Sequence, residues 1–135
     1  MSEKFIYAIL GPGVSGKGAR NLLQSKDIRH LAIGPDNLKE WGSDFSAGNE
    51  SLVCIGENDS GIDKYFDGLK YLVLSPGIPR SHPLVEKFIK AKKEVINEID
   101  LAYLFNSSGT YIGVTGTYGK PTTVTLIDHI LKTAN

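Results

Sequence analysis

Short apolar runs alternate along the chain with segments whose apolar residues recur at helical spacing. Each run is continuous or nearly so and ends at glycine, proline or polar residues, which is typical of strands buried on both faces of a parallel sheet. The pattern predicts five strands, at residues 5–10, 29–33, 52–55, 71–74 and 94–96.

Helical patterns lie between these runs, at 18–25, more weakly at 64–69, and at 82–92. Strands and helices in alternation, joined by short loops, favour an α/β fold with a Rossmann-like, doubly wound and mainly parallel five-stranded sheet. Ligands of such sheets bind beyond the carboxyl ends of the strands. We therefore expect the loops after the first, second and fourth strands to form one binding crevice.

The loop after the first strand contains the pattern G-x-G-x-x-G, formed by Gly11, Gly13 and Gly16. Glycines at this spacing allow a tight turn and bring a phosphate close to the amides that open the next helix. Asp36 follows at the distance where an acidic residue would meet a ribose hydroxyl. A purely structural turn, with Asp36 as a turn or capping residue, is the alternative. Lys17 completes a P-loop-like G-x-x-x-x-G-K, but no hydroxyl residue follows it, so we interpret that match as coincidence.

A second glycine-rich loop lies near the C-terminus. Strand-like residues 111–114, a glycine turn at 115–120 and a helical pattern at 122–131 follow one another as in a P-loop. The hydroxyl that would bind Mg²⁺ must come directly after the lysine, and that position is Pro121. Proline supplies neither a hydroxyl nor an N–H group, although the first turn of a helix accepts it.

Composition excludes several classes of partner. The chain has 135 residues, of which 41% are hydrophobic, as expected for one globular domain with an appendage. Lys plus Arg and Asp plus Glu number 15 each, so no basic excess favours nucleic acid or a membrane surface as a partner. Cys54 is the single cysteine, and its apolar surroundings indicate a core thiol. Without a long apolar span or a signal-peptide pattern, we expect a cytoplasmic protein.

Three stretches in order resemble the Mur ligases, most closely the members that add D-glutamate. They are SPGIP at 75–79, HPLVEKFIKAKKEVINEIDLAYLF at 82–105 and IGVTGTYGKPTT at 112–123. The resemblance extends from the first glycine loop to about Leu131. It implies an enzyme of peptidoglycan synthesis with an N-terminal Rossmann-like domain for the UDP part of its substrate, a central ATPase domain and a C-terminal domain for the incoming amino acid.

The resemblance implies a division of this chain in two. Residues 1–96 would form the domain that binds UDP-N-acetylmuramoyl-L-alanine or a related UDP-sugar. Residues 97–135 would form a linker helix and the strand, glycine-rich loop and helix that open a truncated ATPase domain. In the family, ATP phosphorylates a substrate carboxylate and an amine then attacks the acyl phosphate. We expect no ligation by this polypeptide alone.

The site residues follow from the same resemblance. The family uses ATP and Mg²⁺. In this chain Tyr118 stands where the family usually has asparagine, and Pro121 stands where it has Ser or Thr, so the Mg²⁺ ligand is missing. We therefore predict neither a metal site nor a complete catalytic set. Contacts to the UDP part are predicted for Gly11, Gly13, Val14, Ser15, Gly16, Asp36, Asn37, Ser75, Gly77 and Ile78. The degenerate ATP loop would comprise Thr115, Gly116, Thr117, Gly119, Lys120 and Thr122.

Two other functions are compatible with these patterns. The chain could be a free-standing dinucleotide-binding module, or a non-catalytic interaction or regulatory relic. The resemblance implies that a strand at 110–114 would lie inside the sheet of the missing ATPase domain, so we expect it to join the edge of the Rossmann sheet or to pair with a second chain in a homodimer. We interpret His82, beside Pro83 at a helix start, and Trp41 as structural residues.

Overall fold

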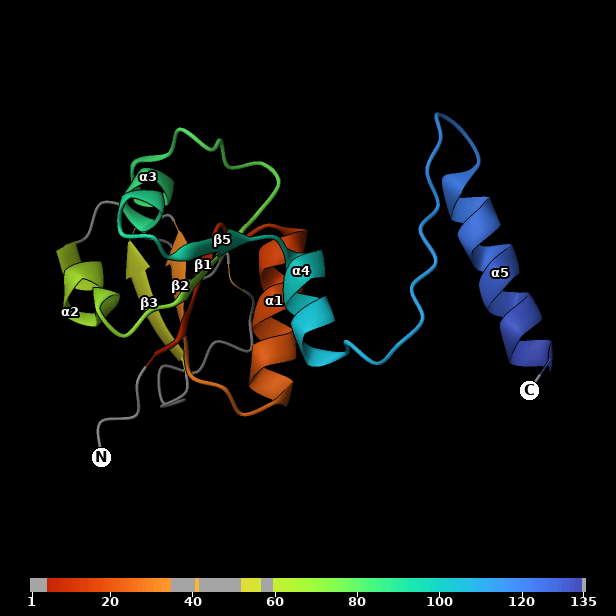
Figure 1. Cartoon of the computed structure of the whole chain (residues 1–135), viewed down its shortest axis with the longest axis horizontal. Coiled ribbons are helices and arrows are strands. Elements are labelled where there is room, and N and C mark those ends of the chain that lie inside the picture. Colours follow the sequence, from red (N-terminus) through yellow and green to blue (C-terminus); the bar gives the residue numbers. More distant parts are fainter. Residues whose placement is uncertain (1–4, 35–40, 42–51, 57–59, 135) are drawn as a thin grey trace.

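A sheet of five parallel strands forms the centre of the fold, in the order β3-β2-β1-β4-β5 (Figure 1). The structure is a computed structural model that describes residues 5–34, 41, 52–56 and 60–134. Its strands are β1 (Tyr7–Leu10), β2 (His30–Gly34), β3 (Leu52–Gly56), β4 (Tyr71–Leu74) and β5 (Glu94–Ile96). Its helices are α1 (Val14–Ser25), η2 (Ser60–Ile62), α2 (Asp63–Phe66), α3 (Pro83–Lys90), α4 (Glu98–Phe105) and α5 (Lys120–Ala134).

The strand order places β1 in the middle of the sheet. The chain leaves β1 toward β2 and β3 on one side, then returns to form β4 and β5 on the other. The crevice between the carboxyl ends of β1 and β4 is therefore the point where the direction of winding reverses, and ligands of doubly wound folds bind at such a point. The predicted α/β, Rossmann-like and parallel architecture is confirmed.

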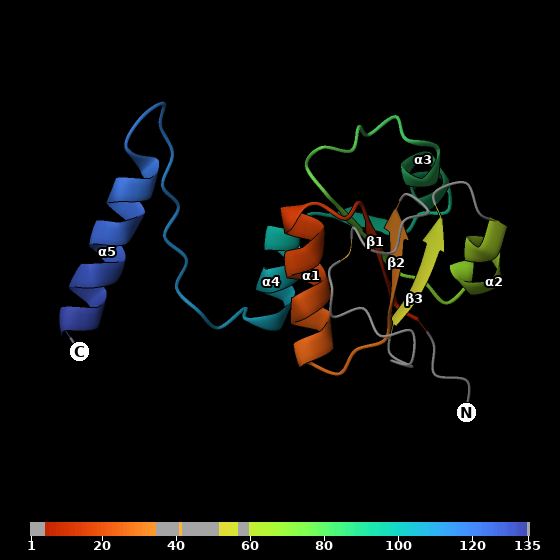
Figure 2. The ribbon, with the colours of Figure 1, turned by 180° about the vertical axis from the view of Figure 1, so that it is seen from behind.

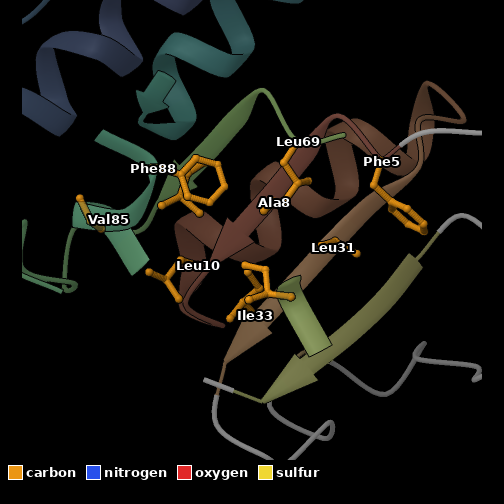
Figure 3. Close-up of a cluster of buried hydrophobic side chains, with 10 residues drawn as sticks. Phe5, Ala8, Leu10, Leu31, Ile33, Leu69, Val85 and Phe88 are labelled. Atoms are coloured by element: carbon orange, nitrogen blue, oxygen red, sulfur yellow. The ribbon is translucent and has the colours of Figure 1, made fainter. Parts of the chain in front are cut away.

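Two apolar layers cover the sheet because successive side chains of a strand point to opposite faces. Ala8 and Leu10 of β1 join a cluster with Val85 and Phe88 of α3, which Figure 3 shows. Ile9 points the other way, into a second cluster with residues of α1 and α4. Helices α2 and α3 thus lie on one face and α1 and α4 on the other (Figures 1 and 2). Burial on both faces explains why the strands of this sheet are apolar runs.

Two predicted structural residues have the expected roles. The Nδ1 atom of His82 accepts a hydrogen bond from the amide of Leu84 at 3.2 Å and thereby caps α3, whose first residue is Pro83. Trp41 is 1% exposed and packs in the second cluster. Cys54 lies in β3, as the predicted strand at 52–55 requires, and its backbone pairs with β2, while its side chain is outside what the structure describes.

The C-terminal arm differs from the prediction. Residues 110–114 form no strand, and they do not join either edge of the sheet, which ends at β3 and β5 in the described part of the chain. A strand needs a neighbouring backbone for its hydrogen bonds, and no described strand lies beside this segment. Helix α5 has no buried residue and stands apart from the sheet (Figure 2). None of the described helices combines the length and apolarity needed to cross a bilayer.

Candidate functional site

The glycine turn after β1 is shaped by two close approaches. Gly11 has φ +99°, a conformation that side chains rarely adopt, and its amide donates to the carbonyl of Ile33 at 2.9 Å. A Cβ atom on Gly16 would lie 1.9 Å from the carbonyl oxygen of Gly11, so residue 16 cannot carry a side chain without moving the turn. Around Gly13, by contrast, no atom lies within 4 Å of a Cβ position. Packing requires glycine at 11 and 16, while position 13 is open to a ligand.

The turn leads directly into α1, which begins four residues earlier than predicted, at Val14. Gly13 is its N-cap and provides no side-chain hydrogen bond, and the first turn contains no acidic residue. The first amides of a helix lack intrahelical acceptors, and the helix dipole adds partial positive charge there. The amides of residues 13–16 therefore form an uncapped helix start that suits a phosphate.

The loop after β4 packs directly against this turn. Ser75 is 7% exposed, its Oγ donates to the carbonyl of Gly11 at 3.1 Å, and its amide donates to the carbonyl of Leu10 at 3.1 Å. The amide of Ile78 donates back to the carbonyl of Ser75 at 3.0 Å. The structure thus brings the predicted residues at 11–16 and 75–78 together at the switch point.

Four further residues were predicted to contact the UDP part. Asp36 and Asn37 lie outside the described residues. Gly77 is in the loop after β4, and a Cβ atom there would have no neighbour within 4 Å. Val14 is 92% exposed at the start of α1.

A cavity of about 420 Å³ extends the crevice toward β5. It lies between the loop after β4 and the junction of β5 with α4, and one arginine and two carboxylates stand among its apolar side chains. Its lining comprises Leu74, Ser75, Pro76, Ile78, Arg80, Val95, Ile96, Asn97, Glu98, Ile99 and Asp100. Our sequence interpretation predicted only Ser75 and Ile78 of this set. A capping pattern directly after a strand, N-x-x-D at 97–100, is the signal that could have located the part contributed by α4.

The first turn of α4 is well ordered by its own hydrogen bonds. The side-chain oxygen of Asn97 accepts from the amides of Ile99 and Asp100 at 2.8 Å each, and Asp100 accepts in return from the amide of Asn97 at 3.1 Å. Glu98 contacts α1, where its Oε1 accepts from the hydroxyl of Ser15 at 2.7 Å. Leu101, fully buried, belongs to the second apolar cluster. Helix α4 is therefore packed against the glycine turn and α1.

The second glycine loop is distant from the first (Figure 2). Gly116 and Gly119 have φ values of +145° and +78°, and Lys120 Nζ donates to the carbonyl of Gly116 at 2.5 Å. Thr115, Thr117 and Thr122 are exposed. Pro121 is the second residue of α5, so the position after the lysine has no hydroxyl. The loop could cradle a phosphate, but its residues do not fit a bound Mg²⁺ in the P-loop manner.

Among the described residues, no three His, Cys, Asp or Glu side chains are grouped closely enough to hold a metal ion. Burial lowers the pKa of His30, at the opposite end of β2 from the crevice. That histidine therefore belongs to the core and not to the candidate site.

Comparison with known proteins supports the resemblance noted in the sequence. No protein-family model matches the chain. A UDP-N-acetylmuramoylalanine--D-glutamate ligase of Protochlamydia amoebophila is 40% identical over 126 residues, which are 92% of this chain and 28% of that protein. Ligases of the same name from Listeria monocytogenes and Aquifex aeolicus are 45% and 39% identical over 93% of this chain, which covers 27% and 25% of their lengths.

These similarities extend over nearly the whole chain and involve several proteins of one name. The chain spans about a quarter of the length of the curated relatives that it matches. The resemblance to the N-terminal part of the Mur ligases is confirmed: the chain is homologous to part of the D-glutamate-adding ligases.

Proposed function

We propose that this chain provides the UDP-substrate-binding part of a peptidoglycan-synthesis ligase that joins D-glutamate to UDP-N-acetylmuramoyl-L-alanine. The observation that supports it most is the 34–45% identity to such ligases along the chain. The geometry agrees, because an uncapped helix start opens at the switch point of a parallel sheet, where such folds bind nucleotides.

In this proposal the diphosphate binds the amides of residues 13–16, where the helix dipole favours negative charge. The loop at 75–78 forms the neighbouring wall of the crevice. The segment after β2, which contains Asp36 and Asn37, is assigned to the uracil or ribose on the sequence pattern alone. Arg80 is the cation among the side chains that line the cavity on the β5 side.

We propose that the boundary between the two domains lies between residues 96 and 97. The first part is the substrate-binding domain, and residues 97–135 are the linker helix and the opening of an ATPase domain. ATP and Mg²⁺ would serve the ligase reaction, in which a carboxylate is phosphorylated and then attacked by an amine. Because Pro121 does not fit the Mg²⁺ site, we assign no phosphoryl-transfer step to this chain.

Cytoplasmic location and self-association through the arm are further parts of the proposal. Apolar side chains that are about half exposed follow one another along the arm, and such surfaces favour contact with another protein surface. They are Tyr111, Ile112, Val124, Leu126, Ile130 and Leu131. Light scattering tests the pairing, and a monomer at high concentration would contradict it.

Ligand-induced thermal shifts test the binding function. A ligand present at 100 times its dissociation constant stabilises the folded chain by about 2.7 kcal/mol. We expect shifts with UDP-N-acetylmuramoyl-L-alanine and with UDP, and none with NAD. A shift with NAD alone would favour the dinucleotide-binding module, and no shift with any of the three would favour an interaction protein.

Substitution of Gly13 locates the site. The open space around Gly13 and its φ of −62° accept a side chain, so Gly13→Asp should fold while placing a carboxylate at the phosphate position. Gly13→Asn is the matched control, because it has the same shape and capping ability without the charge. We expect UDP binding to be lost with aspartate and weakened much less with asparagine. Equal affinities of the two variants would contradict the assignment of the diphosphate to this helix start.

A further inference from the structure

Ser15 and Glu98 connect the first turns of two helices that are far apart in sequence. Ser15 is the second residue of α1 and Glu98 is the first of α4. The 2.7 Å separation of Ser15 Oγ from Glu98 Oε1 is that of a short, charge-assisted hydrogen bond, and the pair is partly buried. The proposed function assigns Ser15 to the diphosphate, but it gives Glu98 no role.

A serine hydroxyl has one proton to donate. In this structure Ser15 donates it to Glu98, and Ser75 donates its own to the carbonyl of Gly11. Phosphate oxygens are acceptors and need donors. Ser15 therefore cannot donate to a phosphate while it donates to Glu98, and the two hydrogen bonds exclude each other.

The charge of Glu98 acts in the same direction. Helix α1 has neither a capping side chain nor an acidic residue in its own first turn. The carboxylate of Glu98 comes from another helix and lies against this helix start, where an anion is stabilised. A bound diphosphate would bring further negative charge to the same place, so carboxylate and phosphate repel each other and compete for one position.

We propose that Glu98 is a positioning residue that holds Ser15 in the unliganded protein and lowers the affinity of the site for phosphate-bearing ligands. The diphosphate takes the hydroxyl of Ser15, and the side chain of Glu98 turns away. Helix α4 itself stays in place, because Asn97 and Asp100 cap its start and Leu101 is fully buried. This inference rests on the proposed function, since it concerns the same UDP site.

Titration calorimetry of the full chain with UDP and with uridine tests the inference. Removing the charge in Glu98→Gln should tighten UDP binding about three- to tenfold at low salt, a size typical of a partly exposed hydrogen bond to a charged group. Uridine has no phosphate, so its affinity should not change. Added salt should reduce the gain, because screening weakens charge repulsion.

Two control variants show whether the effect passes through Ser15. Glu86→Gln removes one surface charge on α3 at an exposed residue that does not line the cavity, and should change neither affinity. In a Ser15→Ala background the gain from Glu98→Gln should shrink, because the hydroxyl that the two acceptors share is absent. Circular dichroism and urea unfolding confirm that each variant is folded.

Each outcome is decisive. Tighter UDP binding with unchanged uridine binding supports the role of Glu98, even if the unsubstituted chain binds UDP too weakly to detect. Equal UDP affinity of the original chain and Glu98→Gln overturns this inference and leaves the proposed function standing. Absence of UDP binding to both proteins overturns the inference and the proposed function together.

Discussion

Adding one methyl group at Gly16 should destabilise the chain, although alanine favours helices. A Cβ atom at this position would lie 1.9 Å from the carbonyl oxygen of Gly11, against 3.4 Å for ordinary contact, so the two must separate by about 1.5 Å. The opposing atom is backbone, in a turn hydrogen-bonded to Ile33, and cannot rotate away as a flexible side chain would. Overpacking of this kind costs about 1–3 kcal/mol or more. The higher helix propensity of alanine offsets only about 0.5–1 kcal/mol of this loss of stability.

Gly18→Ala is the matched control, because the same methyl group is added to the same helix. Gly18 is exposed, and a Cβ atom there meets nothing within 4 Å. We expect urea unfolding, followed by circular dichroism, to show Gly16→Ala less stable by about 0.5–2.5 kcal/mol, with a correspondingly lower urea midpoint. Gly18→Ala should be more stable by about 0.5–1 kcal/mol. If Gly16→Ala were as stable as the original chain, the argument from the close approach of the turn would be wrong.

Two further expectations concern stability. Burial lowers the pKa of His30 below its usual value of 6.5, so the folded chain favours the neutral imidazole. As the pH falls through 6.5, the unfolded chain binds the proton before the folded chain does. The stability that the neutral imidazole contributes is therefore complete above this pH and is lost as the pH drops below it. Urea midpoints at about pH 7.5 and about pH 5.5 should differ less in His30→Gln than in the original chain, and an equal difference would contradict this assignment. Leu101→Ala should lower the free energy of unfolding by about 2–5 kcal/mol, because the side chain is fully buried. Deletion of residues 107–135 should change the free energy of unfolding little, because α5 contains no buried residue. Calorimetric unfolding of the two variants measures both, and a large loss on deletion would show that the arm supports the domain.

Much of the central sheet could be predicted from short-range patterns. The run at 71–74 and the brief run at 94–96 became β4 and β5 with the predicted bounds. Such runs are informative because strands covered on both faces have no polar face to interrupt them. Boundaries near the glycine turn were less predictable. Helix α1 begins at Val14 and not at residue 18. Gly16, a poor helix former, lies in its first turns because the close approach to Gly11 leaves no room for a side chain there.

The candidate site was only partly predictable. Glycine spacing and the resemblance to ligases indicated the turn at 11–16 and the loop at 75–78, and the structure brings them into contact. The cavity at the β5–α4 junction and the contact of Ser15 with Glu98 join residues distant in sequence, and no local pattern describes that proximity. The strand predicted at 110–114 does not form. Its apolar residues suit a strand, but a strand also needs a neighbouring strand to pair with, and the local pattern does not supply one.

The sequence by itself determined the alternation of strands and helices, the glycine turn, the proline after Lys120 and the homology to D-glutamate ligases, because these depend on residue type and spacing along the chain. Only the tertiary structure decided which face α1 and α4 cover, why Gly11 and Gly16 resist a side chain, and which acceptor takes the proton of Ser15. These depend on distances across the fold, which arise when the strand order brings separate loops to one end of the sheet.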